Sequence, residues 1–209
     1  MHGRAGREPA GRLPDVMSLE TDRPVRGAQF AIQLLSQKWL REDLSKVDLC
    51  SHGRLRLEIG GQVLSDGGDD IGISETALAL LMTLERDHTA AAPVAERLVF
   101  HGCGAILMMG CPIGVDWSVR HDGNLVHLDD VVVYPTTNER DAVAHPEAAT
   151  TFPLTEYRGH VLPFAEAARA FFQAAGPKTI EDDFDRKSYA EFWSEFDGRV
   201  ERQRKFDPA

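Results

Sequence analysis

A histidine and two cysteines lie close together in the middle of the sequence, in His101-Gly102-Cys103 and Gly110-Cys111-Pro112. Neutral imidazole and thiolate are ligands that Zn²⁺ prefers, and glycines let the backbone approach an ion closely. The spacing lacks the Cys-x-x-Cys pair of structural zinc sites. His101, Cys103 and Cys111 are therefore a candidate metal site, although we favour buried, inert cysteines that pack beside glycines.

The same residues could also support nucleophilic catalysis by a cysteine thiol. Cys103 would act as a nucleophile, with His101 or His121 as its base, if the thiol is partly exposed and its pKa is lowered. Together with the metal alternative, this makes a small metal- or thiol-dependent hydrolase one possible function. The sequence contains neither of the glycine-rich motifs that bind phosphates or dinucleotides, and we expect no cofactor.

A second group of polar residues is positioned by a predicted β-hairpin over 115–134. Asp122-Gly123 fits a type I′ turn, which pairs 121 with 124, 119 with 126 and 117 with 128. On the opposite face Asp116 then faces Asp129, and Ser118 faces His127. Facing carboxylates repel each other, so this face requires Arg120, a protonated His127, a bound cation or a basic group from a partner.

The formal net charge is −10, and residues 62–177 contain 16 acidic and only six basic side chains. Such a surface repels nucleic acids and anionic membranes and attracts a basic protein. We therefore predict contacts with a basic partner rather than catalysis, and no direct binding of nucleic acid or membrane. The predicted contact residues come from the hairpin and from the loop 65–70: Asp116, Asp129, Asp130 and His127, then Asp66, Asp69 and Asp70.

In size, reduced cysteines and concentrated negative charge, the chain resembles bacterial immunity or inhibitor proteins in general. The resemblance is one of type and covers no specific motif. It implies a non-catalytic module that covers the active site of a basic toxin or nuclease.

The composition predicts one soluble α+β domain over 27–205, with a disordered tail at 1–26 and a short tail at 206–209. Three cysteines are an odd number, and the amino terminus lacks the apolar run of a signal peptide. These features predict a cytoplasmic protein.

Periodicity predicts the elements that must carry these residues. A helix begins at Gly27, because Phe30, Leu34, Leu35 and Trp39 share a helical stripe. Alternating residues around Gly60-Gly61 predict a hairpin over 54–64 in a mainly antiparallel sheet. A buried helix over about 75–88 follows the N-cap Ser74, and 104–109 predicts a short buried strand.

Two helices close the predicted fold, over about 155–175 and 185–203. The second has an aromatic stripe that we interpret as core packing, with a partner-docking groove or a homo-oligomer interface as alternatives. Its members are Tyr189, Phe192, Trp193, Phe196 and Val200.

Overall fold

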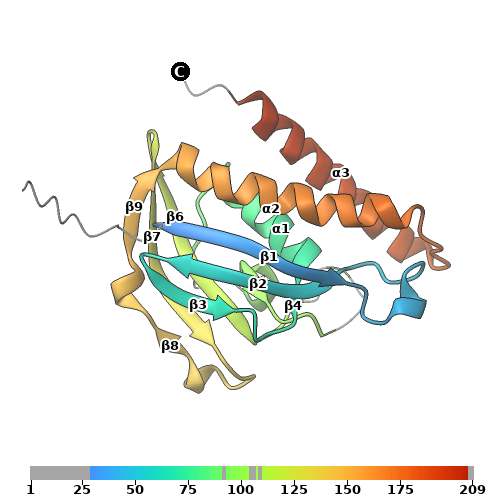
Figure 1. Cartoon of the computed structure of the whole chain (residues 1–209), viewed down its shortest axis with the longest axis horizontal. Helices are drawn as coiled ribbons and strands as arrows, with labels where there is room; N and C mark the ends of the chain where they lie inside the picture. The colour runs from blue at the N-terminus through green and yellow to red at the C-terminus, as the bar shows by residue number, and fades with distance from the viewer. Residues whose placement is uncertain (1–28, 91–92, 104–106, 108–109, 207–209) are drawn as a thin grey trace, which may run out of the picture.

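The computed structural model describes residues 29–90, 93–103, 107 and 110–206. The predicted tail at 1–26, most of the predicted strand at 104–109 and residues 207–209 lie outside this part of the chain. Within the described residues, two antiparallel sheets and three α-helices form the predicted α+β fold (Figure 1).

The first sheet contains the predicted amino-terminal hairpin. Its strand order is β1-β2-β3, and the short β4 pairs with β2. Gly60 and Gly61, with φ of +57° and +79°, form the turn that the sequence predicts. The strands are β1 (Phe30–Lys38), β2 (His52–Ile59), β3 (Gln62–Asp66) and β4 (Ile71–Gly72).

The predicted helix at the start of the domain is wrong, because this segment is strand β1. Phe30 and Ile32 are buried and alternate with more exposed residues, as in any half-buried strand. A β-bulge between Leu34 and Ser36 then adds one residue to the strand. Phe30 and Leu34 are four residues apart, an even spacing that shares one face of a strand as well as of a helix, and Leu35 at the bulge is exposed rather than part of an apolar stripe.

The second sheet contains the predicted hairpin of β6 and β7. Its order is β5-β6-β7-β8, and β9 also pairs with β7. Trp117, Val119, Val126 and Leu128 are all buried, so the predicted core face is correct. The strands are β5 (Val99–Phe100), β6 (Gly114–Asp122), β7 (Leu125–Tyr134), β8 (Val143–Ala144) and β9 (Thr150–Pro153).

The predicted register of this hairpin is wrong by two residues. Asp122 pairs with Leu125, so Gly123-Asn124 is the turn and Val119 faces Leu128 rather than Val126. Gly123 has φ of +58° whereas Asn124 has no positive φ, a pattern typical of a type II′ turn. The carbonyl of Asn124 accepts a 2.8 Å hydrogen bond from the N–H of Leu154, a tertiary contact at this turn.

Helix α1 (Ile73–Thr83) is the predicted buried helix, and it is almost entirely enclosed. It is shorter than predicted, because the backbone of His88 pairs with Val119 of β6 through two 2.9 Å hydrogen bonds. Gly72 rather than Ser74 occupies the N-cap position, and the Ser74 hydroxyl instead accepts from the N–H of Ser51.

The two carboxyl-terminal helices, α2 (Leu154–Ala175) and α3 (Asp183–Lys205), confirm the predicted pair. Figure 1 shows α2 lying along β1, with α3 crossing nearby. Phe192, Trp193, Phe196 and Val200 of α3 are buried in the common core, as predicted for the aromatic stripe. Four 3-10 turns complete the described elements: Glu42–Leu44, Val94–Glu96, Glu139–Asp141 and Pro146–Ala148.

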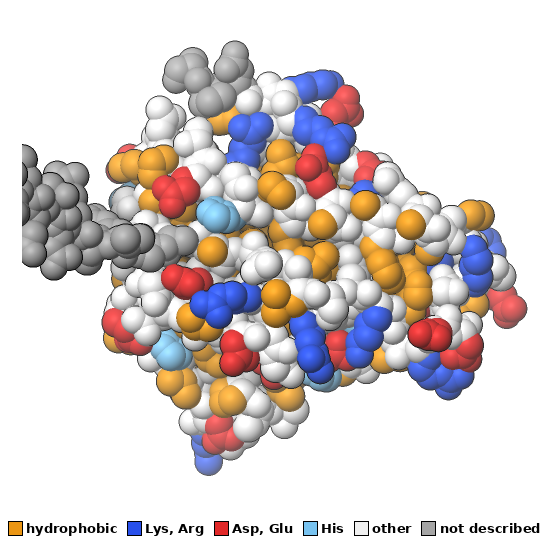
Figure 2. All heavy atoms as spheres, viewed as in Figure 1, with side chains coloured by type: hydrophobic (Ala, Val, Ile, Leu, Met, Phe, Trp, Pro, Cys, Tyr) orange, Lys and Arg blue, Asp and Glu red, His pale blue; other side chains and the backbone are white. Residues whose placement is uncertain are grey.

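Acidic and basic side chains are interspersed on the face shown in Figure 2, over α2 and the first sheet. The net negative charge is therefore not gathered into one patch on this face. A binding site must be sought from local geometry rather than from the overall charge.

Candidate functional site

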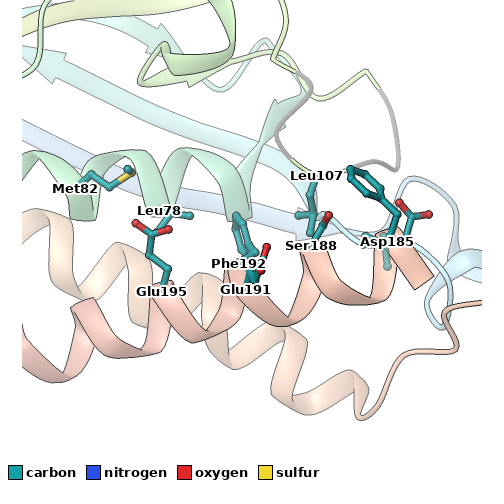
Figure 3. Close-up of a pocket in the computed structure, with 10 residues that line it drawn as sticks. Leu78, Met82, Leu107, Asp185, Ser188, Glu191, Phe192 and Glu195 are labelled. Atoms are coloured by element: carbon teal, nitrogen blue, oxygen red, sulfur yellow. The ribbon is translucent and has the colours of Figure 1, made fainter. Parts of the chain in front are cut away.

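A groove of about 360 Å³ opens between α1 and the first half of α3. Figure 3 shows Leu78 and Met82 of α1 on one side and Phe192 of α3 on the other, with Leu107 near one end. The groove therefore has a largely apolar lining. Its lining residues are Leu49, Leu78, Met82, Leu107, Phe184, Asp185, Ser188, Glu191, Phe192 and Glu195.

The charged side chains that line the groove are three carboxylates on α3, those of Asp185, Glu191 and Glu195 (Figure 3). Together with Ser188 they recur every three or four residues, which places them along one side of the helix. Asp185 and Glu195 are ten positions apart, a length of about 15 Å along a helix axis. Helix α3 thus gives the groove a negative edge.

Neighbouring basic groups only partly offset this edge. Lys187 Nζ lies 3.7 Å from Glu191, and the Arg199 guanidinium lies 2.8 Å from Glu195. Asp185 takes part in none of the ion pairs found within the described residues. The Lys187–Glu191 pair is exposed and contributes only about 0–1 kcal/mol, so a cationic ligand can compete for Glu191 and bind beside Asp185.

Phe184 adds an exposed ring to one end of the groove. It lies in the first turn of α3 and is 74% exposed, an unusual position for so large an apolar side chain. The sequence suggested a docking groove at the aromatic stripe of this helix only as an alternative, and it did not predict the lining from α1, because the shape of the groove depends on the distance between α1 and α3. The signal in the sequence was the set of acidic residues beside the aromatic stripe.

The structure brings together His101, Cys103 and Cys111, the candidate metal ligands. A ring nitrogen of His101 and the two sulfurs all lie within 4.8 Å of one another. His101 lies where the sheets meet, because it forms a bridge with Ile71 of β4 and its N–H donates to Ile113 at 2.9 Å. Cys103 is exposed and Cys111 is buried, and both are free thiols.

His121 does not join this group. It lies seven residues along β6 from Gly114, roughly 23 Å at the rise of a strand, and its Nδ1 is 2.8 Å from Asp87. Burial and the neighbouring Cys111 raise the pKa of the Cys103 thiol. A raised pKa disfavours the thiolate that a nucleophile requires, and thiol chemistry at Cys103 stays a prediction.

A second cluster, Asp48, Cys50 and His52, was not anticipated from the sequence. These three side chains also offer ligand atoms within 4.8 Å of one another, but all are fully enclosed. Burial, with the charges of Glu75 and Asp48, raises the pKa of Cys50 far above its ordinary range. The Asp48 carboxylate accepts from the N–H groups of Leu40 and Cys50, which identifies it as part of the structural framework.

The predicted pair of facing carboxylates on the hairpin is wrong. Asp116 lies opposite Val132, and Asp129 lies opposite Ser118. Asp116 is fully buried, where its carboxylate is 2.9 Å from His88 Nε2 and accepts from the N–H of Leu98. Burial raises its pKa, although His88 acts in the opposite direction. Asp116 is therefore a core residue and presents no surface contact.

The other predicted contact residues of the hairpin stay near its surface. Asp129 lies 3.8 Å from Arg120, and His127 Nδ1 lies 2.7 Å from the Thr151 hydroxyl. Asp130 has φ of +49° at a bulge in β7, and its carboxylate accepts from Ser118 at 2.9 Å. Each of these polar groups has a partner in its own sheet.

The three predicted aspartates of the loop before β4 belong to the other sheet. Asp66 accepts from the N–H of Gly68, and Asp70 pairs with Lys38 at 3.0 Å. Asp69 lines a small hollow between the sheets. These residues and the hairpin aspartates are therefore distributed over two sheets, and whether either set contacts a partner stays a prediction.

None of the described helices combines the length and apolar composition needed to cross a membrane. Comparison with known proteins gives no match: no family model fits the sequence, and no curated protein or solved structure is significantly similar to it.

Proposed function

We propose that the protein is a non-catalytic binding module of the immunity or inhibitor type, and that its groove binds a basic amphipathic helix of a protein partner. One observation carries the proposal: an apolar groove is bordered by three carboxylates and no basic residue among its described lining. The acidic composition of the whole chain supports the same kind of partner.

The dimensions of the groove favour a helix as the occupant. An amphipathic helix binds by placing apolar side chains at i, i+3, i+4 and i+7 into a groove. The carboxylates of Asp185, Glu191 and Glu195 extend over about 15 Å, the length of roughly three helical turns. Lysines or arginines beside the apolar face of such a helix can lie opposite these carboxylates.

A synthetic peptide tests this mode of binding directly. The probe is a labelled leucine–lysine peptide of about 14 residues in an amphipathic helical pattern, roughly four turns long. A scrambled peptide of the same composition and a leucine–glutamate version are the controls. Fluorescence anisotropy should show binding of the amphipathic lysine peptide alone, weakening as salt rises because exposed charges are screened.

The matched variants remove equal charge inside and outside the groove. Asp185→Asn, Glu191→Gln and Glu195→Gln together should weaken binding roughly tenfold, since each exposed charge pair contributes up to about 1 kcal/mol. Glu181→Gln, Asp183→Asn and Glu201→Gln change three exposed carboxylates that do not line the groove. Equal losses in both triple variants, or equal binding of the scrambled peptide, would contradict the proposal.

A further inference from the structure

The arrangement of His101, Cys103 and Cys111 carries an inference that is independent of the groove. Their ligand atoms converge to within 4.8 Å although Cys111 is ten residues from His101 in the sequence. In a tetrahedral site with bonds of about 2.0–2.3 Å, neighbouring ligand atoms lie roughly 3.6–3.8 Å apart. Small side-chain movements would therefore bring the three atoms into coordination.

The backbone of His101 and Gly102, on one side of the group, is held in place by hydrogen bonds. The N–H of Gly102 donates to the Asp70 carbonyl at 2.8 Å, and the N–H of His101 donates to Ile113 at 2.9 Å. A Cβ at Gly102 would lie 2.6 Å from His52 Nδ1, so only glycine permits this close packing. The backbone of His101 and Gly102 is thus held in place before any ion binds.

The His101 ring provides a second observation. Its Nδ1 is buried and has no hydrogen-bond partner in the described structure. A buried polar atom without a partner has a free-energy cost of about 1–3 kcal/mol, and coordination of an ion by the ring or a hydrogen bond formed on binding would remove it. A disulfide between Cys103 and Cys111 would leave the His101 nitrogen without a partner.

We propose that His101, Cys103 and Cys111 bind one Zn²⁺ ion. Two sulfurs and one imidazole nitrogen are soft and borderline ligands, which favour Zn²⁺ over Mg²⁺ or Ca²⁺. Three protein ligands leave the fourth tetrahedral position for water, as in catalytic rather than structural zinc sites. Binding of the ion does not require that the site hydrolyse a substrate.

Metal binding by the reduced, chelator-treated chain tests the proposal. We expect one equivalent of Zn²⁺ to be retained against a chromogenic chelator, and Co²⁺ to give a thiolate charge-transfer band with intense tetrahedral visible bands. Zn²⁺ should also raise the unfolding temperature, because the ion binds the folded form. No retained metal in the fully reduced protein would overturn the proposal.

Three variants locate the ion. Cys103→Ser is the decisive one, because Cys103 is exposed and its replacement leaves the core intact. It should abolish the cobalt charge-transfer band or reduce it by half, and His101→Gln should weaken zinc binding at least tenfold. Cys50→Ser, in the buried Asp48 cluster, is the control and should retain the full spectrum. If Cys50→Ser loses the cobalt spectrum and Cys103→Ser retains it, the ion lies in the Asp48 cluster and the proposal is refuted.

Discussion

Lys178 shows how a single residue responds to its surroundings. Its ammonium group lies 3.3 Å from the centre of the Trp39 ring and donates to the Ser45 carbonyl at 2.8 Å. Burial lowers the pKa of Lys178 to about 8, although the charge of Asp48 acts in the opposite direction. The folded protein therefore holds this proton less tightly than the unfolded chain, whose lysines titrate near their ordinary value of about 10.4.

This pKa predicts the sign of a pH effect on stability. Below pH about 8 Lys178 is charged in both the folded and the unfolded protein, and the cost of burying this charge disfavours folding. As the pH rises toward about 10, the folded form loses its proton first, and this cost disappears. The stability of the natural protein relative to Lys178→Met should therefore increase over this range. Urea unfolding of both proteins at a series of pH values measures this difference in the free energy of unfolding.

Lys187→Met is the control for that experiment, because Lys187 is exposed on α3. The interpretation of Lys178 fails if both variants show the same trend, or if the relative stability of the natural protein falls as the pH rises.

For single residues, the sequence predicted convergence correctly only where the residues are close along the chain. His101, Cys103 and Cys111 lie within eleven positions of one another and do meet. The alternation with Trp117 assigned Asp116 to the outer face of the hairpin, whereas its buried carboxylate lies 2.9 Å from a ring nitrogen of the half-buried His88, 28 residues away. Burial of a charged group depends on such distant partners, which a local pattern cannot identify.

At the scale of the element, local patterns misled where they fit two arrangements. Residues four apart share one face in a strand as well as in a helix, so Phe30 and Leu34 of β1 suggested a helix. The turn lies at Gly123-Asn124 rather than Asp122-Gly123, which shifts the partner of Asp116 two residues beyond Asp129, and the bulge in β7 adds one more. The hairpin of β2 and β3 was predicted correctly because two adjacent glycines with positive φ determine its turn. The helices α2 and α3 were also predictable from their apolar periodicity, although α2 contains Pro163 in its interior.

The turn at Gly123 and the helix at Gly159 predict opposite effects of one substitution. A Cβ at either position would meet no atom within 4 Å, so only backbone preference is changed. Gly123 has φ of +58°, so Gly123→Ala should destabilise the protein by about 1–2 kcal/mol. Gly159 lies inside α2, so Gly159→Ala should stabilise it by about 0.5–1 kcal/mol.

Chemical denaturation of both glycine variants, analysed with a common slope, measures the two changes in the free energy of unfolding. A loss of stability in both proteins would show that the Gly159 region is not an open helix face. A neutral Gly123→Ala would show that the turn is not at Gly123-Asn124.

For the whole molecule, α3 links packing to the proposed binding. Its aromatic stripe packs into the core of its own chain. The centroid of the Trp193 ring lies 4.5 Å from that of Phe172 and 5.0 Å from that of Phe196. These rings are thus occupied within the chain, and a homo-oligomer through this stripe stays a prediction without support. The α+β class followed from the sequence, whereas the groove did not, because it is formed by the separation of two helices.

Two phenylalanines of α3 separate stability from binding. Phe196 is fully buried, so Phe196→Ala should reduce the free energy of unfolding by about 3–5 kcal/mol. Phe184 is 74% exposed, so Phe184→Ala should change stability by at most about 0.5 kcal/mol. If the groove binds an amphipathic helix, Phe184→Ala should nevertheless weaken binding of the leucine–lysine peptide several-fold, because aromatic anchors contribute much of the energy of such interfaces. Thermal unfolding and peptide anisotropy on the same samples compare the two effects. Unchanged peptide affinity in Phe184→Ala would mean that the exposed ring has no part in the proposed interface.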